Sequence, residues 1–200
     1  YLLSMGIKNI TIIDYDKVQL SNLNRQIIFS KNDIGKYKVH CAKKYLKNNF
    51  NDANIKYHNI KINKKNCSKI ISKTNIVIDG TDNWKTMIII NDYCVKNNIP
   101  LLSASVAGYD GNFILFKNYP NKHLCLRCIF PLKRDLNLPR CETVGILGTS
   151  AGIIGILSAH KVINFLTLDD KYSNIIYFDG KKLDFKEIKV SANHVCKLLK

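Results

Sequence analysis

Acidic side chains are scarce in this sequence: 15 Asp and Glu stand against 31 Lys and Arg among 200 residues. The resulting formal net charge of +16 suits a phosphate-rich or acidic partner. A nucleic-acid interface needs basic residues gathered together with stacking aromatics. The lysines here are instead spread along the whole chain, so we expect a polyanionic cofactor or an acidic protein partner and no nucleic acid.

Continuous apolar runs of membrane-span length are missing as well. No segment has the ~18–20 continuous apolar residues of a membrane span, and the opening YLLSMGIKN lacks the regions of a signal peptide. The seven cysteines are an odd number without secretory context, so we expect reduced thiols and no disulfide framework. These features favour a cytoplasmic protein without a membrane partner. The chain is long enough for one core, which predicts a single domain over residues 1–200.

Short β-branched runs alternate with amphipathic segments in the first half of the chain, a pattern typical of a parallel sheet with crossover helices. The predicted strands cover residues 10–13, 55–62, 75–79 and 100–105. The predicted helices cover residues 36–50, 67–72 and 84–96.

The second half changes character. Two hairpin signals, YDGN and FDGKK, flank a long apolar segment that predicts a helix over residues 144–166. Further strands are predicted over residues 113–116, 175–178 and 183–190, and a polar loop over residues 133–140. The fold class is therefore α/β, a Rossmann-like doubly wound sheet whose parallel strands are continued by antiparallel strands at the C-terminal end.

The N-terminus lacks the feature that usually opens a nucleotide-binding half of such a fold, a strand followed by a Gly-rich turn and a helix. Residues 1–5 read as the tail of a helix, closed by Gly6 as a left-handed cap. The first strand and the Gly-rich turn are missing before it. We therefore expect an N-terminally incomplete sequence.

The segment DYDKVQLSNLNRQ directly follows the first predicted strand and is unusually polar. Ligands of doubly wound sheets bind outside the carboxyl ends of the strands, so Asp14 can accept hydrogen bonds from ribose hydroxyls. Asp16 could take the same role, and a solvated carboxylate is the alternative. Arg25, with Asn22 and Gln26 beside it, offers a planar fork of donors that suits phosphate, although most arginines simply lie on the surface.

Lysines and carboxylates further along also suit a phosphate ligand. Lys38 lies near the start of a predicted helix, where backbone donors favour anions, but Lys36 and Lys43 are equally suitable by charge. Asp79 and Asp82 follow another strand in VIDGTDN. Mg²⁺ prefers one or two carboxylates together with phosphate oxygens. Turn formation explains these aspartates equally well.

Cysteines at zinc-knuckle spacing occur in CLRC, which contains Cys125 and Cys128. A tetrahedral zinc site needs four ligands. The C-terminal HVCKLL adds Cys196, while Leu199 stands where a fourth cysteine would complete the second pair. His194 could substitute for it, and two free thiols are the alternative.

Another cysteine suits a chemical role. Cys141 lies in PRCETVG before a predicted helix, whose N-terminus would lower the thiol pKa and favour a nucleophile. An inert thiol is the alternative, which fits Cys41, Cys67 and Cys94 better because they lie in apolar or helical runs.

In their order along the chain, DYDKVQLSNLNRQ, DIGKYKV, DGTDN, CLRC, RCETVGILG and FDG resemble the ThiF/MoeB/HesA family of ubiquitin-activating-enzyme-like adenylyltransferases. The resemblance covers essentially the whole chain. Within the family, LLSASVAGYDGN and RCETVG look closer to ThiF, which activates the thiamine sulfur carrier, than to MoeB.

The resemblance implies a role for each candidate residue. The ATP site would consist of Asp14 at the ribose, Asn22, Arg25, Gln26 and Lys38 at the phosphates, and Asp82 with Mg²⁺. Cys141 matches a cysteine implicated in sulfur transfer, so the implied catalytic residues are Arg25, Lys38, Asp82 and Cys141. A structural Zn²⁺ would be held by Cys125, Cys128 and Cys196, with Leu199 at the fourth position. The family's GxGGxG turn and the N-terminal helices that lend an arginine to the partner subunit are not in the sequence.

The implied activity is ATP-dependent adenylation of the C-terminal carboxylate of a ubiquitin-like, ThiS-like sulfur-carrier protein, giving an acyl-adenylate and pyrophosphate for thiamine biosynthesis. The implied partners are that carrier, a persulfide-bearing sulfur donor and a second copy of the chain in a homodimer. One alternative is MoeB-like activation of the molybdopterin-synthase small subunit. The others are an NAD-binding oxidoreductase and a non-catalytic scaffold.

Overall fold

The structure is a computed structural model that describes residues 1–117, 124–130, 145–168, 174–190, 196 and 198. It divides into two compact units, Tyr1–Lys61 and Ile62–Lys200, which are described one at a time. The single domain expected over residues 1–200 stays a prediction.

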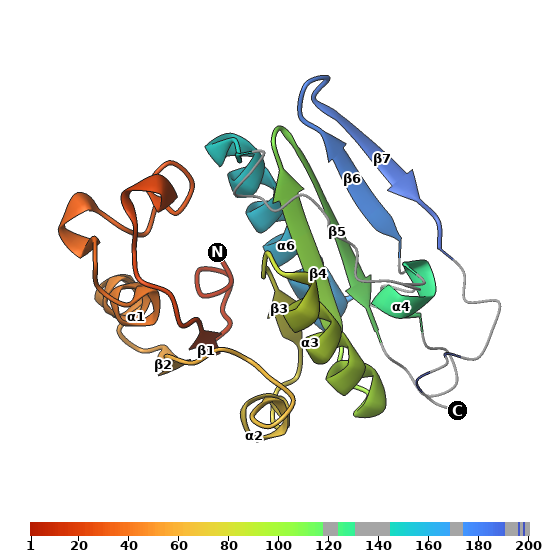
Figure 1. Cartoon of the computed structure of the whole chain (residues 1–200), viewed down its shortest axis with the longest axis horizontal. Coiled ribbons are helices and arrows are strands. Elements are labelled where there is room, and N and C mark those ends of the chain that lie inside the picture. Colours follow the sequence, from red (N-terminus) through yellow and green to blue (C-terminus); the bar gives the residue numbers. More distant parts are fainter. Residues whose placement is uncertain (118–123, 131–144, 169–173, 191–195, 197, 199–200) are drawn as a thin grey trace. The chain divides into compact units, whose positions relative to one another are not determined.

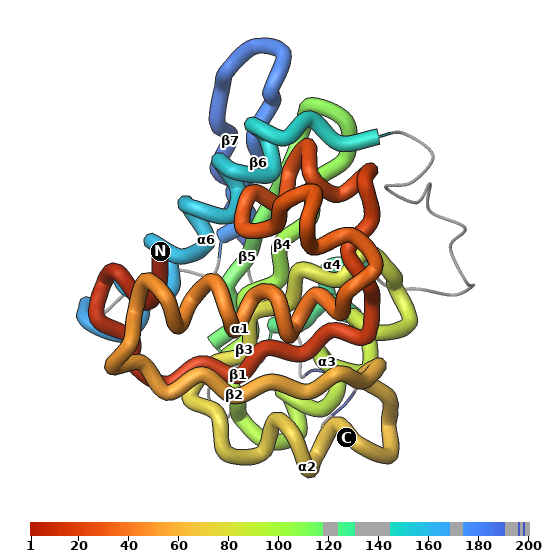
Figure 2. Tube along the Cα trace, turned by 90° about the vertical axis from the view of Figure 1, so that its left-hand side faces the viewer, coloured from red at the N-terminus to blue at the C-terminus, as the bar shows by residue number. Residues whose placement is uncertain are grey.

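The first unit is built around a parallel pair of strands. β1 (Asn9–Ile13) pairs with β2 (Asn54–His58), and α1 (Lys38–Asn49) joins them and packs alongside both (Figure 2). The connection from β1 to α1 carries the short 3-10 turns η1 (Leu20–Asn22) and η2 (Lys31–Asp33). Apolar side chains from these elements and from the N-terminal turn form one core: Leu3, Ile10, Ile12, Leu46, Phe50, Ala53 and Ile55.

The second unit starts with another parallel pair. β3 (Val77–Asp79) pairs with β4 (Leu101–Ala107). Between them runs α3 (Trp84–Lys96), which begins where Asn83 Oδ1 accepts a hydrogen bond from Thr86 N at 2.9 Å. Such N-terminal capping satisfies a backbone donor that the helix itself leaves unpaired. A short helix, α2 (Cys67–Ile71), precedes β3.

The sheet of the second unit then continues with antiparallel strands. β5 (Asp110–Phe116), β6 (Ile175–Asp179) and β7 (Asp184–Ile188) extend it in the order β3-β4-β5-β6-β7 (Figure 1). The helical turn α4 (Leu126–Ile129) follows β5 in the chain. The predicted α/β fold, with parallel strands continued by antiparallel strands, is confirmed.

The apolar helix α6 (Gly148–Thr167) passes behind β4 and β5 in Figure 1 and packs on both. By length and composition alone this helix could cross a membrane, and one side of it packs on β4 and β5. Gly111 in β5 permits the close approach, because a Cβ there would overlap the side chain of Ile154. A single missing side chain therefore sets how closely α6 lies on the sheet.

The FDG segment ties the last two strands to β5. Asp110 accepts hydrogen bonds from the Tyr177 hydroxyl at 3.0 Å and from Gly180 N at 3.1 Å. A Cβ at Gly180 would overlap the backbone carbonyl of Tyr109, so the turn requires glycine. The FDG motif is thus explained by the packing of this turn against β5, which the sequence alone does not show.

Most predicted elements are present, with shifted ends. The helix expected over residues 144–166 begins at Gly148, and the strand expected over residues 55–62 ends at His58. Gly6 has a φ of +95°, as its expected role as a left-handed cap requires. The loop expected over residues 133–140 lies outside the described residues.

Candidate functional site

Asp14 stands at the carboxyl end of β1, as expected. Its backbone N–H still pairs with the His58 carbonyl at 3.2 Å, and its Oδ1 accepts a hydrogen bond from Asp16 N at 2.8 Å. Burial raises the pKa of the Asp14 carboxyl, and the Asp16 N–H and the Lys38 cation act against that shift. The carboxylate is therefore partly desolvated but still reachable, since about a third of its side chain is exposed.

Lys38 is the first residue of α1 and points at these carboxylates. Its Nζ lies 3.1 Å from Asp16 Oδ2 and 4.0 Å from Asp14 Oδ2. The other two candidate lysines have different partners: Lys36 forms a 3.8 Å ion pair with Asp33, and Lys43 lies 4.9 Å from the Tyr57 ring centroid. Of the three lysines, the structure brings Lys38 to the end of β1.

The backbone around Val18 explains why Lys38 reaches that position. Val18 N donates to Lys36 O at 2.8 Å, and Gly35 N donates to Val18 O at 2.9 Å, with Gly35 at a φ of +84°. Lys38 N in turn donates to the Asp16 carbonyl at 2.9 Å. Val18 is only 1% exposed and anchors the segment, a role that sequence reasoning missed. The sequence did contain one signal for this role, because Val18 is a single β-branched residue between the polar residues Lys17 and Gln19.

Two of the predicted phosphate-binding residues after Val18, Asn22 and Arg25, form hydrogen bonds within their own loop. Asn22 Oδ1 accepts a hydrogen bond from Gln19 N at 3.0 Å and is buried, so its oxygen closes the η1 turn. Arg25 Nη1 donates to Ser21 O at 2.8 Å, within its own loop. Gln26 Oε1 is buried without a hydrogen-bond partner among the described residues, which suits a site completed by water or ligand.

The loop after β3 holds the two carboxylates of DGTDN. Asp79 is 1% exposed, its Oδ1 accepts from Thr81 N at 3.0 Å, and its Oδ2 has no partner among the described residues. Burial raises the pKa of Asp79. Asp82 is exposed in the same loop. One turn thus supplies an exposed carboxylate beside a buried one with a spare oxygen, a donor set that fits Mg²⁺ with phosphate oxygens.

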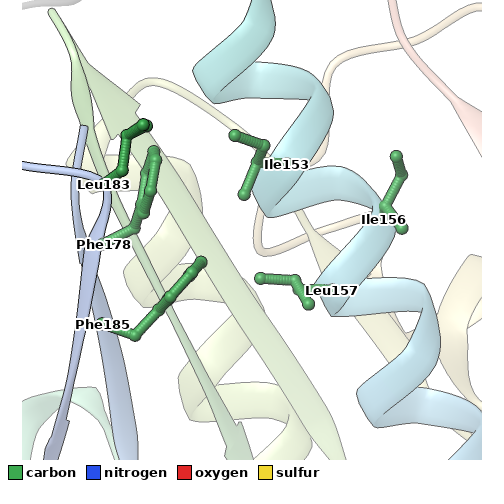
Figure 3. A pocket seen from close by; sticks show the side chains of 6 residues that line it. All are labelled: Ile153, Ile156, Leu157, Phe178, Leu183 and Phe185. Carbon is green, nitrogen blue, oxygen red and sulfur yellow. The ribbon is translucent and has the colours of Figure 1, made fainter.

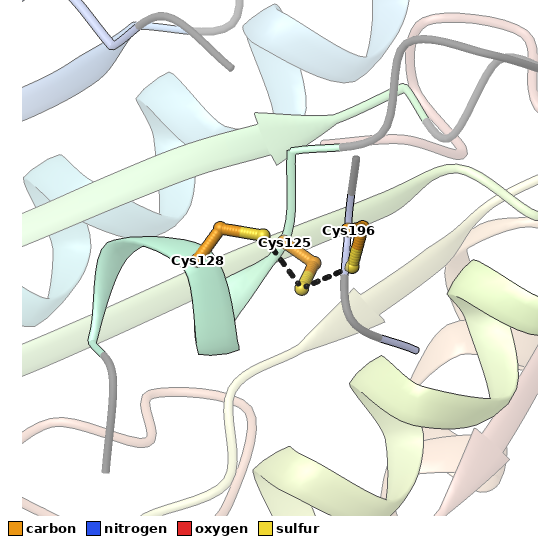
Figure 4. A group of neighbouring side chains, drawn as sticks. All are labelled: Cys125, Cys128 and Cys196. Carbon is orange, nitrogen blue, oxygen red and sulfur yellow. Dashed lines mark hydrogen bonds between the residues drawn. The ribbon is translucent and has the colours of Figure 1, made fainter. Parts of the chain in front are cut away.

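Three cysteines come together from two distant segments (Figure 4). Cys125 Sγ lies 3.6 Å from Cys128 Sγ and 3.5 Å from Cys196 Sγ, and all three sulfurs lie within 4.8 Å of one another. Zinc–thiolate bonds of about 2.3 Å at tetrahedral angles put sulfurs about 3.8 Å apart. The cluster therefore fits three corners of a zinc tetrahedron.

Side chains of α3 fix the helical turn that carries two of these thiols. Asn91 Oδ1 accepts a hydrogen bond from Leu126 N at 2.9 Å, and Asn91 is fully buried. Asp92 binds Arg127 through two bonds, at 2.7 Å to Nε and 2.8 Å to Nη2. Sequence reasoning missed both anchors, because nothing in the order of residues shows that α3 and α4 meet.

The remaining cysteines divide into two groups. Cys41, Cys67 and Cys94 are buried free thiols, and burial raises the pKa of Cys67 to about 11 and also raises that of Cys94, so they are poor nucleophiles. Cys141 lies outside the described residues, as do His194 and Leu199. The sulfur-transfer role of Cys141 stays a prediction.

An apolar hollow of about 330 Å³ lies between α6 and the β6–β7 hairpin (Figure 3). It is lined by Ile153, Ile156, Leu157, Phe178, Leu183 and Phe185. None of these side chains carries a polar atom, so the hollow does not suit a nucleotide.

A family model described as the ThiF family matches residues 1–198. The adenylyltransferase and sulfurtransferase MOCS3 of Xenopus laevis is 35% identical over 194 residues, covering 95% of this chain and 42% of that protein. MOCS3 of Culex quinquefasciatus is 32% identical over 198 residues, covering 95% and 44%. The chain thus spans less than half the length of these curated relatives.

Solved structures show the same fold. The microcin C7 biosynthetic enzyme MccB in complex with N-formylated MccA has a TM-score of 0.82 at 20% identity, covering 98% of this chain and 61% of that one. Escherichia coli MccB with ATP has a TM-score of 0.81 at 20% identity, covering 96% and 59%. The structures support the architecture alone, whereas the family model and the MOCS3 relatives also confirm the resemblance of the motifs: the chain belongs to the ThiF family.

Proposed function

We propose that this chain is the adenylation part of an enzyme that activates the C-terminal carboxylate of a ubiquitin-like sulfur-carrier protein with ATP. The observation that carries the proposal is the cluster of Asp14, Asp16 and Lys38, where a strand end meets the N-terminus of α1. Membership of the ThiF family and relatives named as adenylyltransferases support it.

The proposed reaction is attack of the carrier carboxylate on the α-phosphate of ATP, which forms the acyl-adenylate and expels pyrophosphate. The attacking carboxylate is already ionised, so no general base is required. Lys38 and Arg25 would offset charge that develops on the phosphates, and Asp14 would hold the ribose hydroxyls. Gln26 has a buried oxygen available for the same ligand. Most of the rate enhancement would come from positioning and electrostatics.

Two metal roles belong to this proposal. Mg²⁺ would screen the phosphate charge, and the resemblance assigns it to Asp82. Zn²⁺ would stiffen the second unit through Cys125, Cys128 and Cys196. Cys141 is the candidate to receive the outer sulfur of the donor persulfide, and the resulting Cys141 persulfide would attack the carbonyl of the acyl-adenylate, forming an acyl disulfide and expelling AMP.

The MOCS3 relatives shift the choice of carrier. They support the MoeB-like alternative, the molybdopterin-synthase small subunit, over the ThiS-like carrier that RCETVG and LLSASVAGYDGN favour. A homodimer and a cytoplasmic location remain part of the proposal. An NAD-binding oxidoreductase gains no support from the relatives.

The test is ATP–pyrophosphate exchange in the full-length protein, with each purified carrier added in turn. We expect one carrier to stimulate exchange. Lys38→Ala should lower exchange about 10²–10³-fold, because a group aimed at developing charge is lost. Lys36→Ala is the matched control and should stay within about twofold, since that lysine pairs with Asp33 on the surface.

Other outcomes would contradict the proposal. Binding of NADH without ATP would favour the oxidoreductase. Exchange with neither carrier in the full-length protein would favour the scaffold, and equal activity of the two lysine variants would remove Lys38 from the site.

A further inference from the structure

We propose that Asp16 is a positioning residue of the nucleotide site, whose carboxylate binds the Lys38 ammonium group and is displaced from it by the phosphates of the nucleotide. The inference rests on the proposed function in one respect, which is the place of Lys38 at the ATP phosphates. It goes beyond that function because it gives Asp16 a role separate from that of Asp14 and predicts how this role sets the affinity for nucleotide.

Asp16 contacts both of the other charged residues in this cluster. Its Oδ2 accepts a hydrogen bond from Lys38 Nζ at 3.1 Å, and its carbonyl oxygen accepts one from Lys38 N at 2.9 Å. Its own N–H donates to Asp14 Oδ1 at 2.8 Å. One residue therefore connects the carboxyl end of β1 to the first residue of α1 and sets the position of the predicted phosphate ligand relative to the predicted ribose ligand.

The two carboxylates differ in how they contact the lysine. Lys38 Nζ lies within hydrogen-bond distance of Asp16 Oδ2, whereas Asp14 Oδ2 is 4.0 Å away from it. The Asp14 carboxylate instead accepts the backbone N–H of Asp16. Asp16 is thus the direct counterion of Lys38, and Asp14 is oriented by the backbone.

The exposure of the two side chains allows the ion pair to separate. The side chain of Lys38 is 12% exposed, whereas that of Asp16 is 48% exposed. An ammonium group that is largely removed from water needs an anion beside it. A half-exposed carboxylate is hydrated again when it loses its cation, so the separation costs little on that side. Phosphate oxygens can therefore replace Asp16 at Lys38 without leaving the ammonium group unpaired.

The backbone holds this segment independently of the Asp16 carboxylate. Lys17 and Tyr37 pair as an isolated antiparallel bridge, next to the hydrogen bond from Lys38 N to the Asp16 carbonyl. Both contacts use main-chain atoms alone. The substitution Asp16→Asn therefore removes the charge and keeps the connection between the two segments, so that it tests the counterion role specifically.

Loss of the counterion should have opposite effects on binding and on catalysis. Phosphate no longer competes with a carboxylate for Lys38, so Asp16→Asn should bind ATP about three- to fivefold more tightly, which is what a partly exposed ion pair can contribute. The lysine also loses the anion that orients it, so kcat for pyrophosphate exchange should fall about tenfold. A merely structural role of Asp16 would instead weaken ATP binding together with catalysis.

The experiment is isothermal titration calorimetry of the full-length protein with ATP at a fixed Mg²⁺ concentration and without carrier. Asp16→Glu keeps the negative charge and should restore the Kd of the unaltered protein to within about twofold. Asp52→Asn is the matched control, because it removes the same charge from an exposed ion pair with Lys8. This pair precedes β1 and β2, at the opposite end of the parallel strands from Asp14, and its loss should change the Kd for ATP by less than about twofold.

Two further measurements locate the effect at the phosphates and at Lys38. Inorganic tripolyphosphate has neither ribose nor base, and Asp16→Asn should increase its affinity by the same factor as that of ATP. In a Lys38→Ala background, Asp16→Asn should leave the Kd for ATP unchanged, because its effect acts through Lys38. A gain for ATP but not for tripolyphosphate, or a gain that persists without Lys38, would refute the counterion role.

Weaker or unchanged ATP binding by Asp16→Asn would also overturn the inference. Carrier-stimulated pyrophosphate exchange, measured on the same samples, tests the proposed function separately. Intact exchange without the expected gain in ATP affinity contradicts the role of Asp16 alone. The expected gain without stimulation by either carrier contradicts the proposed function alone, and a lack of ATP binding by the unaltered protein would overturn both.

Discussion

Lys38, which the proposed function places at the ATP phosphates, has two carboxylate neighbours in the structure. Its ammonium group is held 3.1 Å from Asp16 and 4.0 Å from Asp14, and little of its side chain is exposed. The two carboxylates keep the lysine ordered at the start of α1. A phosphate would have to compete with them for the cation, so the pair orients Lys38 in advance at some cost in affinity.

Asp79 is the residue whose ionisation should matter for stability. Burial raises its pKa in the folded chain above the ordinary value of 3.8. The stability linked to this group is fully present below pH 3.8 and is lost as the pH rises through the raised pKa, because the unfolded chain ionises more easily. Asp79→Asn removes the titration but keeps an oxygen for Thr81 N, so the decline in unfolding free energy over that range should become shallower.

The measurement is chemical denaturation of the Asp79→Asn protein over a pH series without added Mg²⁺. Asp82→Asn is the control, and its slope should match that of the unaltered protein because Asp82 is exposed. If both variants change the pH dependence of the unfolding free energy equally, the burial of Asp79 does not cause the decline in stability.

At the scale of elements, α4 depends on its attachment to α3. Asn91→Ala leaves Leu126 N–H buried without its acceptor, which should lower the free energy of unfolding by about 1–3 kcal/mol. Asp92→Ala removes a half-exposed ion pair with Arg127 and should cost less than about 1 kcal/mol. Denaturant titration of both variants checks the order. A larger loss of unfolding free energy in Asp92→Ala than in Asn91→Ala would mean that the ion pair with Arg127, and not the Asn91 hydrogen bond, attaches α4 to α3.

The turn between β6 and β7 gives a second prediction at this scale. Gly180→Ala places a methyl group against the Tyr109 carbonyl and should destabilise by about 1–3 kcal/mol, because backbone cannot move aside as a side chain can. Gly80→Ala is the control, since a Cβ there meets nothing within 4 Å. Thermal unfolding of the two variants compares them, and equal melting temperatures would contradict the overlap.

Elements were predictable where the signal is local. The β-branched run of β1 and the helical spacing of α1 fix those elements, and Asn83 marks the start of α3. Their ends were less predictable, because tertiary contacts decide where a strand stops pairing. β2 ends at His58 although Ile60 and Ile62 continue the apolar pattern.

The candidate site was predictable to the extent that strand ends and helix starts are local features. Asp14 and Lys38 are found at those positions. Leu20 in this loop is 66% exposed and does not anchor it, whereas Val18 holds the loop through backbone bonds to Gly35 and Lys36. Such long-range pairing leaves no periodic signal, so charge and spacing could not choose Lys38 over Lys36 and Lys43, and only the family resemblance did.

At the scale of the whole chain, the excess of basic residues should govern encounter with the proposed carrier. A net charge of +16 attracts an acidic partner over distances comparable to the Debye length, about 10 Å at 0.1 M salt. We expect the KM for the carrier to rise severalfold, by about half to one order of magnitude, between 0.05 and 0.3 M NaCl while kcat changes little, because salt weakens steering but not the chemistry. Pyrophosphate exchange at fixed ATP over a salt series gives both constants. A KM that is independent of salt would mean that the lysines are a solvated surface and that the carrier is recognised by apolar contacts instead.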